Sequence, residues 1–416
     1  MPERHATGKQ TSMTAFKKSI AILAAAMLLS PIGVRADWNQ NNDEANRQRI
    51  MNDMRQTQAS NDRANSDAQF KAQSQRQPSS SPSSGDRSSS SNGSSSSSYV
   101  PSSSGDTDYG QRSVVSTTTV TVGAAETPQK FFGRTSQDAS LGYAKSQFDL
   151  GRMYYAGYGT ARDDAQARRW LGEAAKQGHV VSAALYASIL RNGIGGPVDL
   201  IAARKSFEIA AKGGDARSMA ELGQFHFHGL AGLSSNNDEA VRLWKASSAL
   251  GDSAGMTGLG EVYLYGLAGQ AAQPEEGLKL MKKAAELGER NAMLIYAKLL
   301  NNGDLMPKDL QGAIRYARAS AEMDHSDGQS MMAIYYYMGD GVPQSYDEAA
   351  RWAKLSAAAD NPEGQTTLGT MYYFGQGLPK DIKQAAHWFK KAAAQGNEMA
   401  ISNMKEPDIA EAAKGL

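Results

Sequence analysis

The window MYYFGQGLPKDIKQAAHWFKKAAAQGN, from Met371 to Asn397, holds several residue types that carry chemistry in other proteins. Its Gly-x-Gly, which begins at Gly375, is typical of loops that bind phosphate. His387 stands beside Trp388 and is a candidate proton carrier. Taken alone, the window is a candidate active site with a phosphate loop next to a histidine.

Two further pairs of side chains in the sequence are candidates for a metal site or for acid-base catalysis. His226 and His228 form a His-x-His pair, but residues two apart on a helix point to different faces, so a metal site is not predicted. The paired carboxylates Asp163 and Asp164 fit a helix start, where the helix dipole favours negative charge. No Ser or Asp partner recurs near His387, as a catalytic triad would require. The sequence therefore predicts no catalytic residue, no metal ligand and no cofactor.

The elements that carry these residues are copies of one repeat. Marker glycines recur every 36 or 37 residues, at Gly157, Gly193, Gly229, Gly266, Gly303, Gly339 and Gly375. The second glycine of the Gly-x-Gly becomes Leu305 in the fifth copy, and a phosphate cradle would not tolerate that change. The Gly-x-Gly is therefore predicted to be a turn, and the window is the seventh copy of a structural unit.

Each unit is predicted to hold two helices, the first of which ends at the marker glycine. The second helix begins after a residue that is a good N-cap in six of the seven copies: Asp163, Asp199, Asn236, Gln273, Asp309, Ser345 and Asp381. A core slot follows within this second helix, at Trp170, Ser206, Leu243, Leu280, Tyr316, Trp352 and Trp388. The sequence thus predicts an all-α array of about fourteen antiparallel helices, closed by a short capping helix near Glu398 to Met404.

The repeat pattern resembles the Sel-one-like repeat family, a branch of the tetratricopeptide-type solenoids. LGRMYYAGYG (Leu150 to Gly159) and LGTMYYFGQG (Leu368 to Gly377) are close matches, whereas the second and fifth copies are degenerate. The resemblance covers about residues 143 to 397. It implies a right-handed superhelical solenoid of about seven helix-turn-helix repeats that acts as a scaffold or adaptor for protein complexes. Secreted bacterial members of the family often act in envelope assembly, exopolysaccharide regulation or host interaction.

The composition of the chain limits the classes of partner that it is expected to bind. The 44 Lys and Arg residues against 43 Asp and Glu residues leave a net charge of +1, so neither nucleic acid nor an anionic membrane is a default partner. The chain has no cysteine, which excludes disulfides and thiolate ligands. It also departs in this respect from the cysteine-rich relatives that are reported to bind β-lactams. The resemblance and the composition together indicate one or more protein partners.

The N-terminus resembles a secretory signal peptide over residues 1–36. Lys17 and Lys18 precede an apolar run from Ile20 to Leu29, which is too short to span a bilayer. Val34-Arg35-Ala36 is a suitable cleavage site, and Met13 is an alternative start. The predicted location is the periplasm, with secretion as the alternative, and no stable membrane insertion is expected after cleavage.

Between the signal and the repeats, residues 37–77 are polar and predicted to be largely disordered. Residues 78–139 are predicted to form a Ser-rich linker with a β-prone run, SVVSTTTVTV, which either adds to the sheet edge of a partner or is ordinary linker. The solenoid is assigned to residues 140–404, and residues 405–416 are a C-terminal tail.

Positions that vary between copies while the packing positions stay fixed predict where a partner binds. Three slots on one face of the first helices become apolar around repeats five to seven, which predicts a patch of Tyr265, Ile295, Met331, Ile334, Met338 and Phe374. The alternative is that the superhelix or the C-terminal segment buries these slots. Taken together, the sequence favours a non-enzymatic, exported scaffold in the bacterial envelope over its alternatives, an envelope hydrolase or a glycan-binding module.

Overall fold

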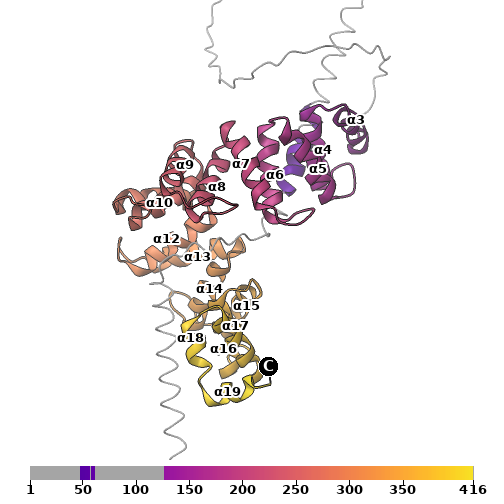
Figure 1. The fold of residues 1–416 in the computed structure, drawn as a ribbon. Helices are drawn as coiled ribbons and strands as arrows, with labels where there is room; N and C mark the ends of the chain where they lie inside the picture. The colour runs from indigo at the N-terminus through magenta and orange to yellow at the C-terminus, as the bar shows by residue number, and fades with distance from the viewer. Residues whose placement is uncertain (1–46, 57, 61–125, 416) are drawn as a thin grey trace, which may run out of the picture.

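The computed structural model describes residues 47–56, 58–60 and 126–415 (Figure 1). These residues form helices joined by short turns, with no strand among them, so the predicted all-α solenoid is confirmed. The predicted signal peptide, most of the Ser-rich linker and the β-prone run lie outside the described residues.

The seven repeats each contribute two helices of thirteen residues. The first helices are α4 (Ala144–Ala156), α6 (Val180–Asn192), α8 (Ala216–His228), α10 (Ser253–Tyr265), α12 (Arg290–Asn302), α14 (Ser326–Met338) and α16 (Pro362–Phe374). The second helices are α5 (Asp164–Lys176), α7 (Leu200–Lys212), α9 (Asn237–Ala249), α11 (Pro274–Glu286), α13 (Leu310–Glu322), α15 (Tyr346–Ala358) and α17 (Ile382–Ala394). The fourteen predicted helices are therefore present in the predicted order.

Local sequence explains where the second helices begin. Six of the seven predicted N-cap side chains accept a hydrogen bond from the backbone amide three residues later, as Asp381 does from Gln384 at 3.0 Å. The exception is Gln273, which makes no such bond and is followed by Pro274 at the first helical position. Every first helix ends at a marker glycine in the left-handed conformation, with φ between 64° and 78°.

The Gly-x-Gly is a turn, as predicted, and the second glycine is needed for packing. A Cβ on Gly377 would lie 2.2 Å from the carbonyl oxygen of Tyr346, at the start of the preceding second helix. A Cβ on Gly159 would lie equally close to the carbonyl oxygen of Pro128. The glycine motif therefore allows close backbone approach between neighbouring units, which is a packing role and not that of a phosphate loop.

The predicted core slot of the second helices is buried in three repeats and only half-buried in the other four, whereas the residue after it is buried in all seven. Trp170 and Trp388 are only half-buried, whereas the residues that follow them, Leu171 and Phe389, are fully buried. In α17 the buried stripe is Ala385, Phe389 and Ala392, spaced as one helical face requires. The buried stripe therefore continues from the small residue, Ala385, to Phe389 four residues later. The aromatic residue before the core position, Trp388, lies at the edge of this stripe.

Helices also form outside the predicted solenoid boundaries. α3 (Pro128–Ser140) occupies the end of the predicted linker and packs on α4 through Phe131. α18 (Glu398–Asn403) is the expected capping helix. The predicted tail contains α19 (Pro407–Ala413), whose Ile409 is fully buried in the cluster around Phe389. Residues 47–56 and 58–60, which we refer to as the N-terminal helical segment, are helical within the region predicted to be disordered.

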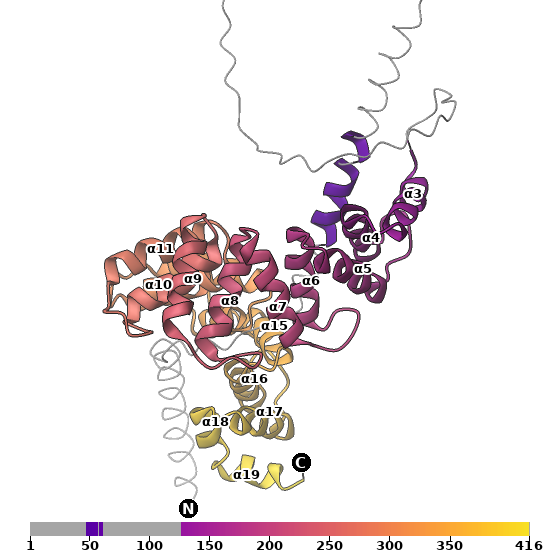
Figure 2. The same cartoon turned by 45° about the horizontal axis from the view of Figure 1, so that its top comes forward.

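The repeats follow a curved path from α3 through α8–α11 to α16–α19 (Figure 2). First helices of adjacent repeats contact one another, as α8 does with α10 and α14 with α16, so the first helices line the inner side. The curvature brings α8 close to the start of α12, since Arg217 on α8 forms an ion pair of 2.9 Å with Glu289, the residue before α12. The inner side is therefore the surface where several repeats meet.

Candidate partner-binding surface

The structure distributes the six predicted partner-binding residues unevenly. Ile295, Met331 and Ile334 are buried, with 3%, 5% and 8% of their surface exposed. Met338 and Phe374 are half-buried, and Tyr265 is 41% exposed. Three members of the predicted patch are thus enclosed by the curvature of the solenoid, and the six residues do not form one contiguous exposed surface. Binding of a partner by the remaining three stays a prediction.

The inner side closes towards the C-terminus. α14 and α16 each bury nine of their thirteen residues, whereas α6 and α8 each bury five. Many of the residues enclosed on α16 are polar but hydrogen-bonded, since the Thr366 hydroxyl donates to the carbonyl oxygen of Pro362 at 2.7 Å. The Gln365 amide donates to Asp360 at 2.7 Å. Helices α14 and α16 therefore form a packed frame, and the open part of the inner side lies in the first three repeats.

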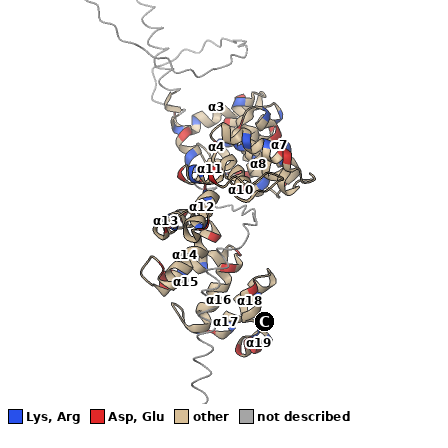
Figure 3. Ribbon diagram, turned by 90° about the vertical axis from the view of Figure 1, so that its left-hand side faces the viewer, with Lys and Arg blue, Asp and Glu red and all other residues tan. Residues whose placement is uncertain are grey.

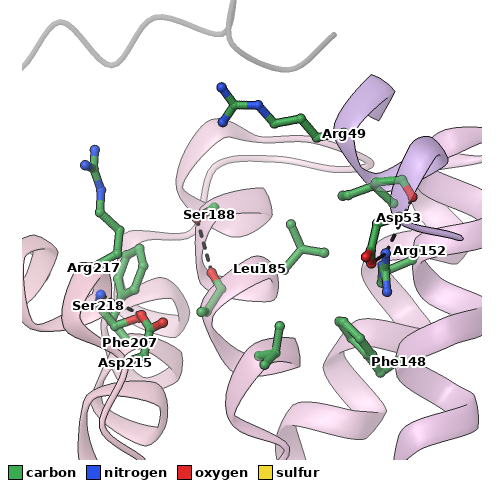
Figure 4. A pocket seen from close by; sticks show the side chains of 13 residues that line it. Arg49, Asp53, Phe148, Arg152, Leu185, Ser188, Phe207, Asp215, Arg217 and Ser218 are labelled. Carbon is green, nitrogen blue, oxygen red and sulfur yellow. Dashed lines mark hydrogen bonds and ion pairs between the residues drawn. The ribbon is translucent and has the colours of Figure 1, made fainter. Parts of the chain in front are cut away.

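An open cavity of about 590 Å³ lies between the N-terminal helical segment and helices α4, α6, α7 and α8 (Figure 4). Its walls are apolar and include Phe148, Leu185 and Phe207. Val181, which is 58% exposed, lies on the same lining. A mostly apolar cavity of this size with a few charged groups is typical of ligand-binding sites.

Three arginines and two aspartates line the same cavity: Arg49, Arg152, Arg217, Asp53 and Asp215. Arg152 forms ion pairs with Asp53 and, at 3.9 Å, with Asp149. Burial raises the pKa of Asp149 more than the neighbouring arginine lowers it. In Figure 3, positions of Lys and Arg and positions of Asp and Glu are interspersed along the ribbon from α3 to α11. The cavity thus combines an apolar floor with charges of both signs.

An ion network connects this cavity to the middle of the solenoid. Glu221 on α8 pairs with Arg191 on α6 at 2.6 Å and with Arg217 at 3.4 Å, and Arg217 continues to Glu289. Burial would raise the pKa of Glu221, but the two arginines outweigh it and hold the pKa below its ordinary value. The network fixes the relative positions of three first helices, α6, α8 and α12, on the inner side.

A carboxyl group with a different environment lies on the next first helix. Glu261 on α10 is 7% exposed, and burial raises its pKa to about 8. Burial, together with the nearby Glu261, raises the pKa of Tyr265 to about 12. Glu261 therefore binds a proton at neutral pH, unlike Glu221 one repeat earlier. Sequence reasoning placed both residues on one face but had no signal for this difference.

The histidines occupy structural positions. His226 and His228 lie in the last turn of α8, and burial lowers the pKa of His228. His387 packs edge-on against Trp388, with 5.2 Å between the ring centres. Within the described ranges no three His, Asp or Glu side chains are grouped as metal ligands. No helix of the described part of the chain is long and apolar enough to cross a bilayer.

Comparisons with known proteins agree with the repeat pattern. The family model for the Sel1 repeat matches seven consecutive copies, at residues 144–179, 180–215, 216–252, 253–289, 290–325, 326–361 and 362–397. The comparison with curated proteins found no match.

Among solved structures, the chain is 26% identical to a protective antigen present in uropathogenic Escherichia coli strains and displaying an SLR fold (TM-score 0.41), with 66% of each chain covered. It is also 26% identical to a Sel1 repeat protein from Oxalobacter formigenes (TM-score 0.46), with 66% of this chain and 79% of that chain covered. The chain thus spans about two thirds of the first of these structures. Because the seven matched copies cover most of the chain, the protein belongs to the Sel1 repeat family.

Proposed function

We propose that this protein is a non-catalytic scaffold of the bacterial cell envelope, which binds a protein partner on the open part of its inner side. Sel1 repeats are generally modules for protein–protein interaction. The observation that carries the proposal is the cavity between the N-terminal helical segment and α8, because it offers apolar walls and paired charges on a frame fixed by several repeats. Regulation or assembly of an envelope or exopolysaccharide complex is the role that fits such a scaffold.

The envelope location is supported by the sequence alone. Lys17 and Lys18, the apolar run from Ile20 to Leu29 and the Val34-Arg35-Ala36 site have the order of a secretory signal. Fractionation of cells that express the full chain tests this part of the proposal. The tagged protein is expected in the periplasmic fraction at the mass of the cleaved chain. Recovery of the uncleaved chain in the cytoplasm would exclude an envelope role.

Capture with a matched pair of variants tests the binding surface. Val181 and Val198 are both 58% exposed, but only Val181 lines the cavity. Val181→Asp places a charge on the apolar wall and is expected to abolish capture of the partner from periplasmic extract. Val198→Asp changes a turn outside the cavity and is expected to capture as the wild-type chain does. Equal capture by both variants would place the binding surface elsewhere.

The same experiment separates the scaffold from its alternatives. A glycan-binding module would retain cell-wall or capsular polysaccharide, and a hydrolase would release fragments from it. We expect the captured material to be protein and the purified chain to leave the polysaccharide unchanged. Retention of polysaccharide without protein would favour the glycan-binding module.

A further inference from the structure

The N-terminal helical segment presents one stripe of side chains to the first repeat. Arg47, Ile50, Met54 and Gln58 follow one another at helical spacing, and Arg47, Met54 and Gln58 are 3%, 2% and 7% exposed. The segment lies beside α4 and appears in indigo in Figure 2. Of its other described residues only Met51 is half-buried, and the rest, Arg55 among them, are exposed. A polar region of the sequence thus contains an amphipathic helix that fits the solenoid.

Each end of the stripe is recognised by polar contacts. Arg47 donates to the carbonyl oxygen of Tyr155 at 2.6 Å and to the carboxylate of Asp164 at 2.8 Å, and its guanidinium carbon lies 4.1 Å from the centre of the Tyr155 ring. Gln58 accepts a hydrogen bond from the hydroxyl of Tyr158. These contacts fix both the direction and the register of the helix.

The middle of the stripe is apolar and is flanked by an ion pair. Met54 packs against Phe131 of α3 and Met153 of α4. Beside it, Arg152 of α4 donates to the carboxylate of Asp53. The segment is therefore held as a ligand helix in a groove would be, with an apolar anchor between polar ends.

The residues that hold the segment are those in which the first repeat differs from the others. The position of Arg152 is taken elsewhere by Ser188, Gln224, Glu261, Lys298, Ile334 and Thr370. The position of Asp164 is taken elsewhere by Leu200, Asn237, Pro274, Leu310, Tyr346 and Ile382. The other repeats fold without these two residues, and in repeat one both contact the segment, while Asp164 also pairs with Arg162 at 2.7 Å.

The groove continues beyond the segment. The cavity of about 590 Å³ begins beside Asp53 and extends along α6 to α8. At its far end the hydroxyl of Ser218 is buried and has no hydrogen-bond partner. A ligand longer than the segment would fill this space and would meet the charged groups of Asp215 and Arg217 there. The segment thus occupies one end of a larger site.

We propose that the N-terminal helical segment is a displaceable ligand in cis, and that the groove it occupies receives an amphipathic helix of the partner protein. The partner helix would carry an arginine followed by apolar residues at the third and seventh positions, like Arg47, Ile50 and Met54. The proposal rests on the scaffold function proposed above. The Ser-rich sequence that joins the segment to the repeats would keep it at an effective concentration on the order of millimolar. A partner helix must overcome this competition, so the segment sets a threshold for binding.

Binding of a labelled peptide to the full mature chain tests the proposal. The probe is a peptide with the sequence of residues 44–61, and its affinity is measured by fluorescence anisotropy. In the variant Arg47→Ala with Met54→Asp, the segment leaves the groove and the peptide is expected to bind. In the wild-type chain the segment competes, so the apparent Kd is expected to be weaker on the order of tenfold to a hundredfold. Arg55→Ala, on the exposed face of the same helix, is the matched control and should behave as the wild-type chain does.

Two results would overturn the proposal. Failure of the double variant to bind the peptide while its helical content is retained would mean that the groove does not recognise such a helix. Equal affinity for the wild-type chain and the double variant would mean that the segment does not compete. Should the double variant lose helical content, Arg47→Ala alone removes only the polar contacts and is expected to show an intermediate gain in affinity. No gain in that variant would also contradict the proposal.

The outcome is independent of the scaffold test. A peptide that binds only the double variant, combined with no protein captured from the periplasm, would leave the groove as a site and reject the scaffold. Capture that depends on Val181, combined with a peptide that binds both chains equally, would support the scaffold and reject competition by the segment.

Discussion

Glu261→Gln is expected to make the solenoid more stable at alkaline pH. The pKa of Glu261 is about 8 in the folded chain, against an ordinary value of 4.5, because the carboxyl is buried. A folded pKa above the unfolded one means that the stabilising form is protonated, and stability is lost as pH rises through the folded pKa. With these two values, the free energy of unfolding falls by about 2.5 kcal/mol between about pH 6 and pH 9. Glutamine keeps the shape of the protonated carboxyl and cannot ionise, so the variant should lack this loss.

Urea unfolding followed by far-UV circular dichroism, at several pH values, measures the effect. The difference between variant and wild-type chain isolates Glu261 from other groups that titrate. Glu286→Gln changes an exposed glutamate on α11 and should leave the pH dependence unchanged. Glu221→Gln should lower the free energy of unfolding at neutral pH, because it breaks the ion pairs with Arg191 and Arg217. The same pH slope for Glu261→Gln and the wild-type chain would refute the reasoning.

Four further substitutions and one deletion test the packing, all by urea or thermal unfolding. Phe389→Ala should lower the free energy of unfolding by about 3–5 kcal/mol, and Trp388→Ala by clearly less, since only Phe389 is fully buried; the reverse order would reject the corrected core slot. Asp381→Ala should cost about 1 kcal/mol through the lost N-cap, and no change would mean that water replaces it. Gly377→Ala should cost about 1–3 kcal/mol at a left-handed position against Tyr346. Deletion of Pro78 to Gly105 should leave the melting temperature unchanged, and a clear drop would mean that this tract packs on the repeats.

Features decided within one repeat could be predicted from the sequence. The spacing of the marker glycines and the N-caps depends on contacts within a few residues, and both are found where expected. The predicted core slot is one residue early in four repeats, because a large residue such as Trp170 or Trp388 stands there, and it is buried as predicted in the other three. The helical spacing of Ala385, Phe389 and Ala392 indicated the correct core position. Similarly, Ile50 and Met54 stood at helical spacing in a polar region, but nothing in the sequence showed that repeat one offers them a groove.

Burial of the inner side could not be predicted because it depends on the sum of small rotations between repeats. The slot of Ile334 is the slot of Arg152 in another repeat, yet Ile334 is enclosed between neighbouring first helices and Arg152 borders an open cavity. Ile334→Asp is consequently expected to unfold its repeat, so loss of binding in such a variant would say nothing about the binding surface.

The two halves of the solenoid therefore contribute differently to binding. On α16 the enclosed polar groups Gln365 and Thr366 already have hydrogen-bond partners within the chain, so a ligand would gain little from them. In the first three repeats the apolar wall at Val181 is exposed. Removing this apolar surface from water favours association. A ligand would therefore gain most free energy of binding beside the N-terminal helical segment. Most of the apolar positions that the sequence alone predicts as a binding patch lie at the opposite end of the solenoid.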